Sequence, residues 1–233
     1  LLPGGQGQGR DQMTRVLKAG RKAPQSGETR SAVVFLHGYG ANGADLLGLA
    51  DPLAEHLPDT LFVAPDAPES IPGMPFGLQW FPIPWIDGSS EEEAHRGLMT
   101  ATADMNAFLD ALMVDEDLLP EQVVLFGFSQ GTMMALHVAP RREDALGGVV
   151  AFSGRLLSPE LLSDEVQSRP PVLLLHGDAD EVVPVQSLPQ AAEALQQAGW
   201  QDVYAHIMKG TGHGIAPDGL SVALAFMRDK LGL

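Results

Sequence analysis

The chain has 233 residues, 45% of them apolar, and its 30 acidic residues against 14 basic ones give a net charge of −16. Such a surface repels phosphate backbones and anionic lipid headgroups, which argues against a nucleic-acid partner and against electrostatic docking on membranes. The absence of cysteine excludes disulfides, thiolate-bound metals and a thiol nucleophile.

No apolar run reaches the ~18 residues that a membrane-spanning helix needs, and the first residues lack the charged-then-apolar layout of a signal peptide. We therefore expect a cytoplasmic protein without stable membrane insertion. Residues 1–25 are predicted to form a flexible N-terminal tail and leading segment. Residues 26–233 are predicted to form a single domain, because no composition shift, charge run or internal repeat divides them.

Short apolar runs alternate along the chain with segments of helical periodicity. Most runs are continuously apolar, which is typical of strands covered on both faces in a parallel sheet. The alternation predicts an α/β fold, a mostly parallel central sheet with helices on both faces, in which ligands bind beyond the carboxyl ends of the strands. The predicted strands are 32–36, 61–64, 123–126, 148–152, 172–175 and 203–208, and the predicted helices include 98–112, 132–139, 188–195 and 220–231, the last with Asp218 as its N-cap.

The stretch from residue 65 to residue 88 holds six prolines together with several large apolar residues. It is too rich in proline for us to expect regular structure and too apolar for a solvated loop. Beside a catalytic site it would form a wall or lid over the substrate; the alternative is a surface loop that tucks its aromatic side chains into the core. The candidate substrate-binding residues are Met74, Phe76, Trp80, Phe81 and Trp85.

The segment Gly127-Phe128-Ser129-Gln130-Gly131 fits the pattern G-x-S-x-G between a predicted strand and a predicted helix. A sharp strand-to-helix turn needs glycine on both sides, because it leaves no room for a Cβ near the nucleophile. The Ser129 hydroxyl would then stand at the sheet edge beside a helix N-terminus, which stabilises developing negative charge. Ser129 is the predicted nucleophile.

A serine hydroxyl needs a base to remove its proton, and His213 is the candidate among seven histidines. It lies between the last predicted strand and the last predicted helix, and the glycines on both sides let the loop swing its imidazole towards the serine. For two other histidines we expect structural roles. His37 is predicted to be buried in a turn and bonded to backbone, and His137, on the helix after the serine, to be satisfied or exposed.

The base in turn needs a carboxylate that holds its tautomer and stabilises the imidazolium. Residues 176–184 follow a predicted strand and supply Asp178 and Asp180. The chain order of serine, aspartate and histidine is then that of α/β-hydrolases. Periodicity does not choose between the two aspartates, and Asp178 could instead cap the turn backbone.

Acyl transfer also needs two hydrogen-bond donors for the oxyanion. One is expected to be the backbone N–H of Gln130, the residue after the nucleophile. The other is expected from the Gly-rich turn at residues 37–43, with the backbone N–H of Tyr39 as the candidate.

Together these segments resemble the phospholipase/carboxylesterase family of α/β-hydrolases, which includes bacterial carboxylesterases and acyl-protein thioesterases. Carried over by position, the resemblance makes Ser129 the nucleophile, His213 the base and Asp180, not Asp178, the orienting acid, and it places the oxyanion donors on Tyr39 and Gln130. It implies no cofactor and no metal, and it allows a homodimer, because many members look dimeric. The matching text is LHGYGANGADLLGLA from residue 36, FVAPDAPE from 62, GFSQGTMMALHVA from 127, HGDADEVVP from 176 and GTGHGI from 210.

We therefore predict a serine carboxylesterase that hydrolyses small-molecule esters of small or medium acyl chain through an acyl-enzyme intermediate. Within the same class, the alternative is an acyl-protein thioesterase or lysophospholipase-like hydrolase of long acyl chains. A non-catalytic scaffold that binds a hydrophobic ligand is the alternative from another class, and it is disfavoured because all three residues of the triad are present in order.

Overall fold

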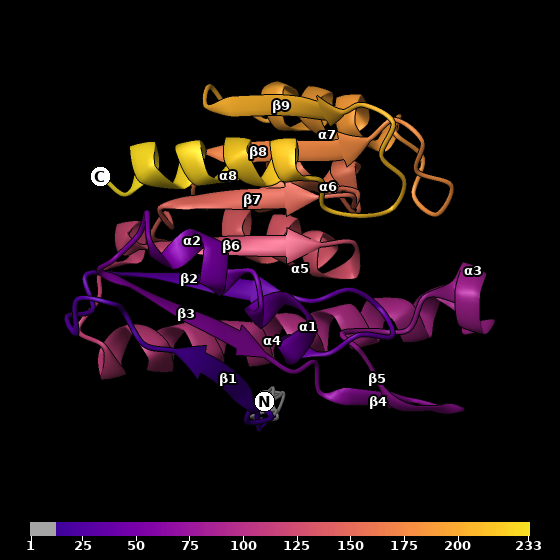
Figure 1. Cartoon of the computed structure of the whole chain (residues 1–233). Coiled ribbons are helices and arrows are strands. Elements are labelled where there is room, and N and C mark those ends of the chain that lie inside the picture. The colour runs from indigo at the N-terminus through magenta and orange to yellow at the C-terminus, as the bar shows by residue number, and fades with distance from the viewer. Residues whose placement is uncertain (1–12) are drawn as a thin grey trace, which may run out of the picture.

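A seven-stranded sheet with the order β1-β3-β2-β6-β7-β8-β9 forms the centre of the computed structural model, which describes residues 13–233 (Figure 1). The predictions for residues 1–12 lie outside the described residues. All neighbouring strands are parallel except β1, which is antiparallel to β3. The strands are β1 (Ala19–Lys22), β2 (Ser31–Leu36), β3 (Thr60–Pro65), β6 (Val123–Phe128), β7 (Gly148–Phe152), β8 (Val172–Gly177) and β9 (Val203–Met208).

The six predicted strands are confirmed, and their burial explains why their sequences are continuously apolar. Every residue of β2, β3, β7 and β8 is buried, because helices cover both faces of the sheet. The strand that the sequence did not predict, β1, is short and partly exposed. It lies within the leading segment expected ahead of the domain, where it extends the sheet by pairing with β3.

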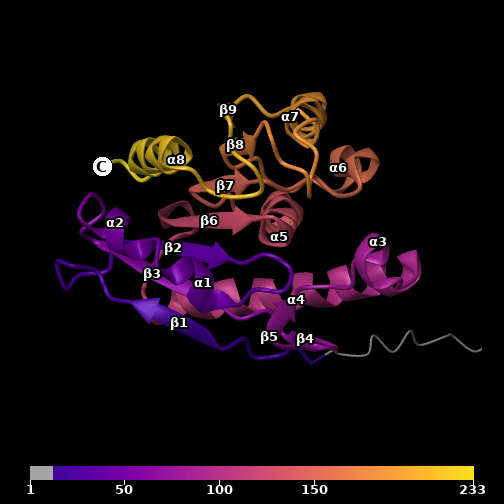
Figure 2. The same cartoon turned by 45° about the vertical axis from the view of Figure 1, so that its right-hand side comes forward.

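Helices pack on both faces of the sheet and enclose two separate hydrophobic cores (Figure 2). On one face lie α4 (Glu91–Asp115), α5 (Gln130–Val138), α6 (Pro159–Glu165) and α7 (Ser187–Gln197). On the other lie α1 (Gly43–Leu47), α2 (Ala50–Ala54) and α8 (Pro217–Lys230). Two short 3-10 turns, η1 (Pro120–Gln122) and η2 (Ala139–Arg141), lie after α4 and after α5. Among residues 13–233, no helix combines the length and the apolar character that crossing a bilayer requires.

The prediction that residues 65–88 lack regular structure is wrong. They form a small hairpin, β4 (Glu69–Ile71) with β5 (Met74–Gln79), followed by the one-turn helix α3 (Pro84–Asp87). Two of the six prolines stand in a turn or at a helix start, where a ladder N–H is not needed. Pro72 precedes Gly73, whose φ of 82° closes the tight turn, and Pro84 occupies the first turn of α3.

The predicted N-cap of the last helix is also wrong. The N-cap of α8 is Ala216, and Asp218 lies in the first helical turn. Its Oδ2 instead accepts a hydrogen bond from Nε2 of His206 on the neighbouring strand β9, at 2.7 Å. Pro217 occupies the first helical position, which proline favours, so the helix begins two residues earlier than the predicted N-cap implies.

His137 is buried on α5, and neither of its ring nitrogens has a hydrogen-bond partner among the described residues. The expectation of a satisfied or exposed imidazole is therefore wrong. Burial, assisted by the nearby Arg141 guanidinium, lowers the pKa of His137 from 6.5 to about 4. The folded protein thus keeps this imidazole neutral at a pH at which the unfolded chain would protonate it.

This difference predicts a loss of stability in mild acid. The unfolded chain takes up the His137 proton first as the pH falls below 6.5, so the free energy of unfolding decreases between that pH and about 4. In urea titrations, the wild type should lose about 2 kcal/mol more than His137→Leu between pH 7.5 and pH 5. Replacing the exposed His56 by Gln is the control, and its free energy of unfolding should depend on pH as that of the wild type does. Equal pH dependence in wild type and His137→Leu would contradict the prediction.

Candidate active site

Ser129 stands at the sharp turn between the end of β6 and the start of α5. Its backbone has φ 55° and ψ −115°, a strained conformation for a residue other than glycine. A Cβ on Gly127 would lie 2.6 Å from the backbone of Thr132, and a Cβ on Gly131 would collide with the carbonyl oxygen of Leu36. The two glycines of the pattern are therefore required sterically, as the sequence predicted, and they leave the serine side chain projecting at the carboxyl edge of the sheet.

The loop between β9 and α8 brings His213 to this serine. Nε2 of His213 lies 3.0 Å from Oγ of Ser129, and the Phe128 ring packs against the imidazole with 4.9 Å between centroids. The loop lies directly against the end of β8, where a Cβ on Gly177 would collide with the carbonyl oxygens of Thr211 and Gly212. Close packing of the loop on β8 thus fixes the position of the imidazole.

Asp180 lies behind the imidazole. Its Oδ2 accepts a hydrogen bond from Nδ1 of His213 at 2.7 Å, and its Oδ1 accepts from the backbone N–H groups of Val182 and Val183, both at 2.8 Å. The side chain is fully buried. Because a carboxylate only accepts, Nδ1 of His213 carries the proton and Nε2 is free to accept one from the serine hydroxyl.

The hydrogen bonds around Asp180 decide its protonation state. Burial alone would raise the pKa of its carboxyl group, but the hydrogen bonds from His213, Val183 and Val182 outweigh burial, and its pKa lies below the ordinary value. The carboxylate therefore stays ionised well into acid, where it continues to hold the imidazole.

Asp178, the other aspartate of this segment, has a different contact. Its Oδ1 accepts a hydrogen bond from the backbone N–H of Gly210 at 2.7 Å, near the start of the loop that carries His213. The sequence left open whether this side chain would orient the histidine or bond to turn backbone. The structure shows the backbone contact.

The two segments that carry the candidate oxyanion donors both adjoin the serine. A Cβ on Gly38 would lie 3.3 Å from Cβ of Ser129, so the turn that carries Tyr39 packs against the nucleophile. Gln130 is the first residue of α5, so its N–H has no partner within the helix. Neither N–H donates to another backbone group among residues 13–233. Their role as oxyanion donors stays a prediction.

A buried hydrogen-bond network behind the site was not predicted in full. The Gln130 side chain accepts from the backbone N–H of Trp80 at 2.9 Å and donates to the carbonyl of Phe81 at 2.8 Å. The Trp80 indole donates to the carbonyl of His37 at 2.9 Å. As predicted, His37 is buried and bonded to backbone: Nδ1 contacts the Gly38 carbonyl, and Nε2 accepts from the Ala67 N–H. These contacts connect both candidate donor segments to the segment after β5.

The five candidate substrate-binding residues divide into two groups. Trp80 and Phe81 are buried in the core beneath α5, at 0% and 4% exposure. Met74, Phe76 and Trp85 lie on the hairpin and α3 with exposures of 47%, 85% and 57%. The structure therefore brings the serine, histidine and aspartate together but separates the aromatic residues, and substrate contact by any of the five stays a prediction.

The sequence model of the phospholipase/carboxylesterase family matches residues 22–231. The chain belongs to this family. Acyl-protein thioesterase 1 of Saccharomyces cerevisiae is 30% identical over 222 residues, which cover 91% of this chain and 97% of that protein. Acyl-protein thioesterase 1 of Gibberella zeae is 27% identical over 222 residues, covering 89% and 94%.

Solved structures agree with this assignment. The crystal structure of esterase PE8 has a TM-score of 0.87 and 43% identity, covering 93% of this chain and 100% of that one. Acyl-protein thioesterase 2 of Zea mays has a TM-score of 0.75 and 25% identity, covering 92% and 99%. The resemblance and the α/β-hydrolase fold inferred from the sequence are confirmed, and the chain is a serine hydrolase rather than a non-catalytic scaffold.

Proposed function

We propose that the chain is a carboxylesterase in which Ser129 is the nucleophile, His213 the general base and Asp180 the orienting acid. The observation that carries this proposal is the continuous contact from Asp180 through His213 to Ser129, at 2.7 and 3.0 Å. Such a chain of contacts activates a hydroxyl that is otherwise a poor nucleophile.

The reaction follows from these positions. Oγ of Ser129 attacks the ester carbonyl carbon while its proton moves to Nε2 of His213. The carbonyl oxygen becomes an oxyanion, which accepts hydrogen bonds from the backbone N–H groups of Tyr39 and Gln130. The C–O bond to the alcohol breaks, and the alcohol leaves with the proton from His213. Water then repeats the steps on the acyl-enzyme and releases the acid.

For the substrate, we propose small-molecule esters of small or medium acyl chain. The supporting observation is the 43% identity to a protein described as an esterase, across nearly the whole of both chains. The burial of Trp80 points the same way, because this large side chain is then not available to line a long groove.

A long-chain thioesterase or lysophospholipase activity is the second candidate. The apolar side chains of Met74, Phe76, Trp85 and Ile86 are exposed at the hairpin and α3, as a surface that receives a long acyl chain would be. Two relatives that match over nearly their whole length are named acyl-protein thioesterases.

Hydrolysis of p-nitrophenyl esters from acetyl to palmitoyl, compared with hydrolysis of palmitoyl-coenzyme A, separates the two candidates. The carboxylesterase proposal predicts that kcat/KM is highest for acyl chains of about two to eight carbons and falls steeply beyond. Rates that hold or rise up to palmitoyl would favour the second candidate. Absence of hydrolysis for every ester, together with no labelling by a fluorophosphonate probe, would contradict both.

A further inference from the structure

Arg155 lies close to the proposed nucleophile. It follows β7 at the carboxyl edge of the sheet, directly after Gly154. A Cβ on Gly154 would lie 2.7 Å from the backbone oxygen of Ser129, so residue 154 packs against the sharp turn between β6 and α5. Consecutive Cα atoms are about 3.8 Å apart, so the Arg155 backbone lies one residue from this contact with Ser129.

The Arg155 guanidinium has no counter-ion in residues 13–233. It makes no ion pair and no hydrogen bond there, and its Nε is buried without a partner. Its carbon Cζ lies over the Trp85 ring, 4.9 Å from the centroid. Arg141 and Arg142, by contrast, pair with the carboxylates of Glu165 and Asp110 at 2.5 and 2.6 Å.

An unpaired arginine here is informative because carboxylates are abundant in the chain, 30 against 14 basic residues. A partly buried polar group without a partner costs free energy. The Trp85 ring holds the guanidinium in place without neutralising it, since the ring offers its face and leaves the N–H donors free.

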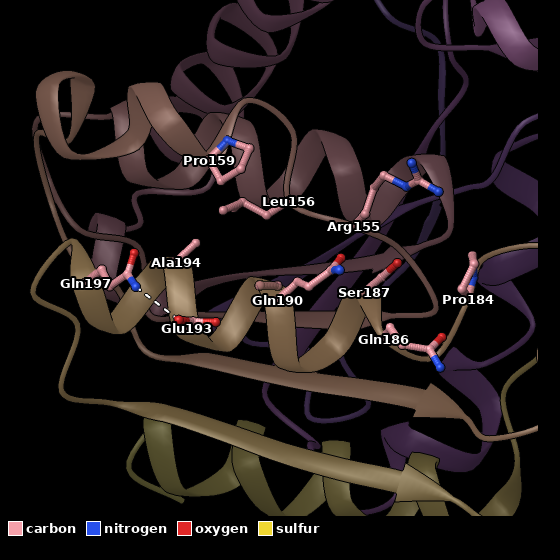
Figure 3. A pocket seen from close by; sticks show the side chains of 11 residues that line it. Arg155, Leu156, Pro159, Pro184, Gln186, Ser187, Gln190, Glu193, Ala194 and Gln197 are labelled. Atoms are coloured by element: carbon pink, nitrogen blue, oxygen red, sulfur yellow. Dashed lines mark hydrogen bonds between the residues drawn. The ribbon is translucent and has the colours of Figure 1, made fainter.

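A cavity of about 580 Å³ extends from this arginine along α7 (Figure 3). Arg155 and Pro184 lie at one end of the row of lining residues, and Glu193 and Gln197 lie towards the other. Glu193 is the only other ionisable residue in the lining, and its Oε1 accepts from the side-chain amide of Gln197. The end of the cavity that holds Arg155 and Pro184 therefore carries a guanidinium with no ion-pair partner among residues 13–233.

We propose that Arg155 is a specificity residue that binds a carboxylate carried by the substrate, so that the enzyme prefers anionic esters over neutral ones of the same shape. A guanidinium offers a planar pair of donors that matches a carboxylate in two parallel hydrogen bonds. The inference rests on the proposed function, because the carboxylate must belong to an ester whose carbonyl is at Ser129.

Two pairs of esters test the proposal and distinguish the acyl side from the alcohol side. Monoethyl adipate and its neutral amide, ethyl 5-carbamoylpentanoate, place the charge in the acyl part. 4-Acetoxybenzoate and 4-acetoxybenzamide place it in the leaving alcohol. The quantity measured is the ratio of kcat/KM for the anionic ester to that for the neutral ester, in the wild type and in Arg155→Gln, Arg155→Lys and Arg155→Glu.

The wild type should prefer the anionic member of at least one pair, and Arg155→Gln should lower the ratio for that pair by about 10- to 100-fold. Arg155→Lys should retain part of the preference as a point charge, and Arg155→Glu should reverse it. Arg169→Gln is the matched control. Its guanidinium also lies over a tryptophan, Trp200, at 5.6 Å, but it precedes β8, at the opposite edge of the sheet, and should leave the ratio unchanged.

The inference would be overturned if the wild type showed no preference for the anionic ester in either pair. It would also be overturned if Arg155→Gln lowered kcat/KM equally for both members of a pair, because the role of Arg155 would then be structural. If the neutral esters are hydrolysed but the ratio is the same in the wild type and in the Arg155 variants, this inference fails while the proposed function stands. Failure of the wild type on all four esters would overturn the proposed function and this inference with it.

Discussion

Replacing Ser129 by Ala should lower kcat for p-nitrophenyl butyrate by about 10⁴-fold or more. The variant keeps the Asp180–His213 pair but loses the hydroxyl oxygen that lies 3.0 Å from Nε2. No acyl-enzyme can then form, and the remaining rate comes from the oxyanion donors and from substrate binding alone.

The fold should survive this change, which makes the activity measurement interpretable. The Ser129 side chain makes no cap hydrogen bond to α5, and alanine accepts a φ of 55° about as poorly as serine does. The melting temperature should therefore stay close to that of the wild type. Ser221→Ala, on the exposed surface of α8, is the control and should keep full activity. A Ser129→Ala protein that retained a tenth of the wild-type rate would show that another group is the nucleophile.

The sheet was predictable because its signal is local. Each central strand is buried on both faces, so continuous apolar runs of four or five residues identify β2, β3, β6, β7 and β8 without knowledge of their partners. The sharp turn at Ser129 was predictable for the same reason. Its two glycines are required because a Cβ there would collide with residues nearby in sequence or on the adjacent strand.

The segment from residue 65 to residue 88 was not predictable in the same way. The two strands of its hairpin pair with a register shift near Ile71, and Leu78 also forms an isolated bridge with Ala41 in a distant turn. Neither feature follows from the local sequence pattern. The division of its aromatic residues between core and surface likewise depends on tertiary contacts. Trp80 is drawn inward by hydrogen bonds to Gln130 and His37, which lie 50 and 43 positions away.

Asp180→Asn should lower kcat for the same ester by about 10⁴-fold. An asparagine at this position cannot satisfy all of the Asp180 contacts. If its oxygen keeps the N–H groups of Val182 and Val183, its NH₂ group faces Nδ1 of His213 and forces the proton onto Nε2, which can then no longer accept from Ser129. If the amide turns over, the NH₂ group meets two backbone donors, and buried N–H groups are left unpaired.

Asp178→Asn is the matched control for this change and tests the alternative that periodicity left open. The two aspartates are two positions apart, yet Asp178 accepts only the Gly210 N–H with its Oδ1. An asparagine oxygen can accept that same hydrogen bond, so the loop that carries His213 keeps its anchor and kcat should fall by less than about tenfold. The difference of some three orders of magnitude between the two variants depends on which carboxylate holds the imidazole. If kcat falls further in Asp178→Asn than in Asp180→Asn, the orienting residue is Asp178. The 2.7 Å contact between His213 and Asp180 would then not be the one that supports catalysis.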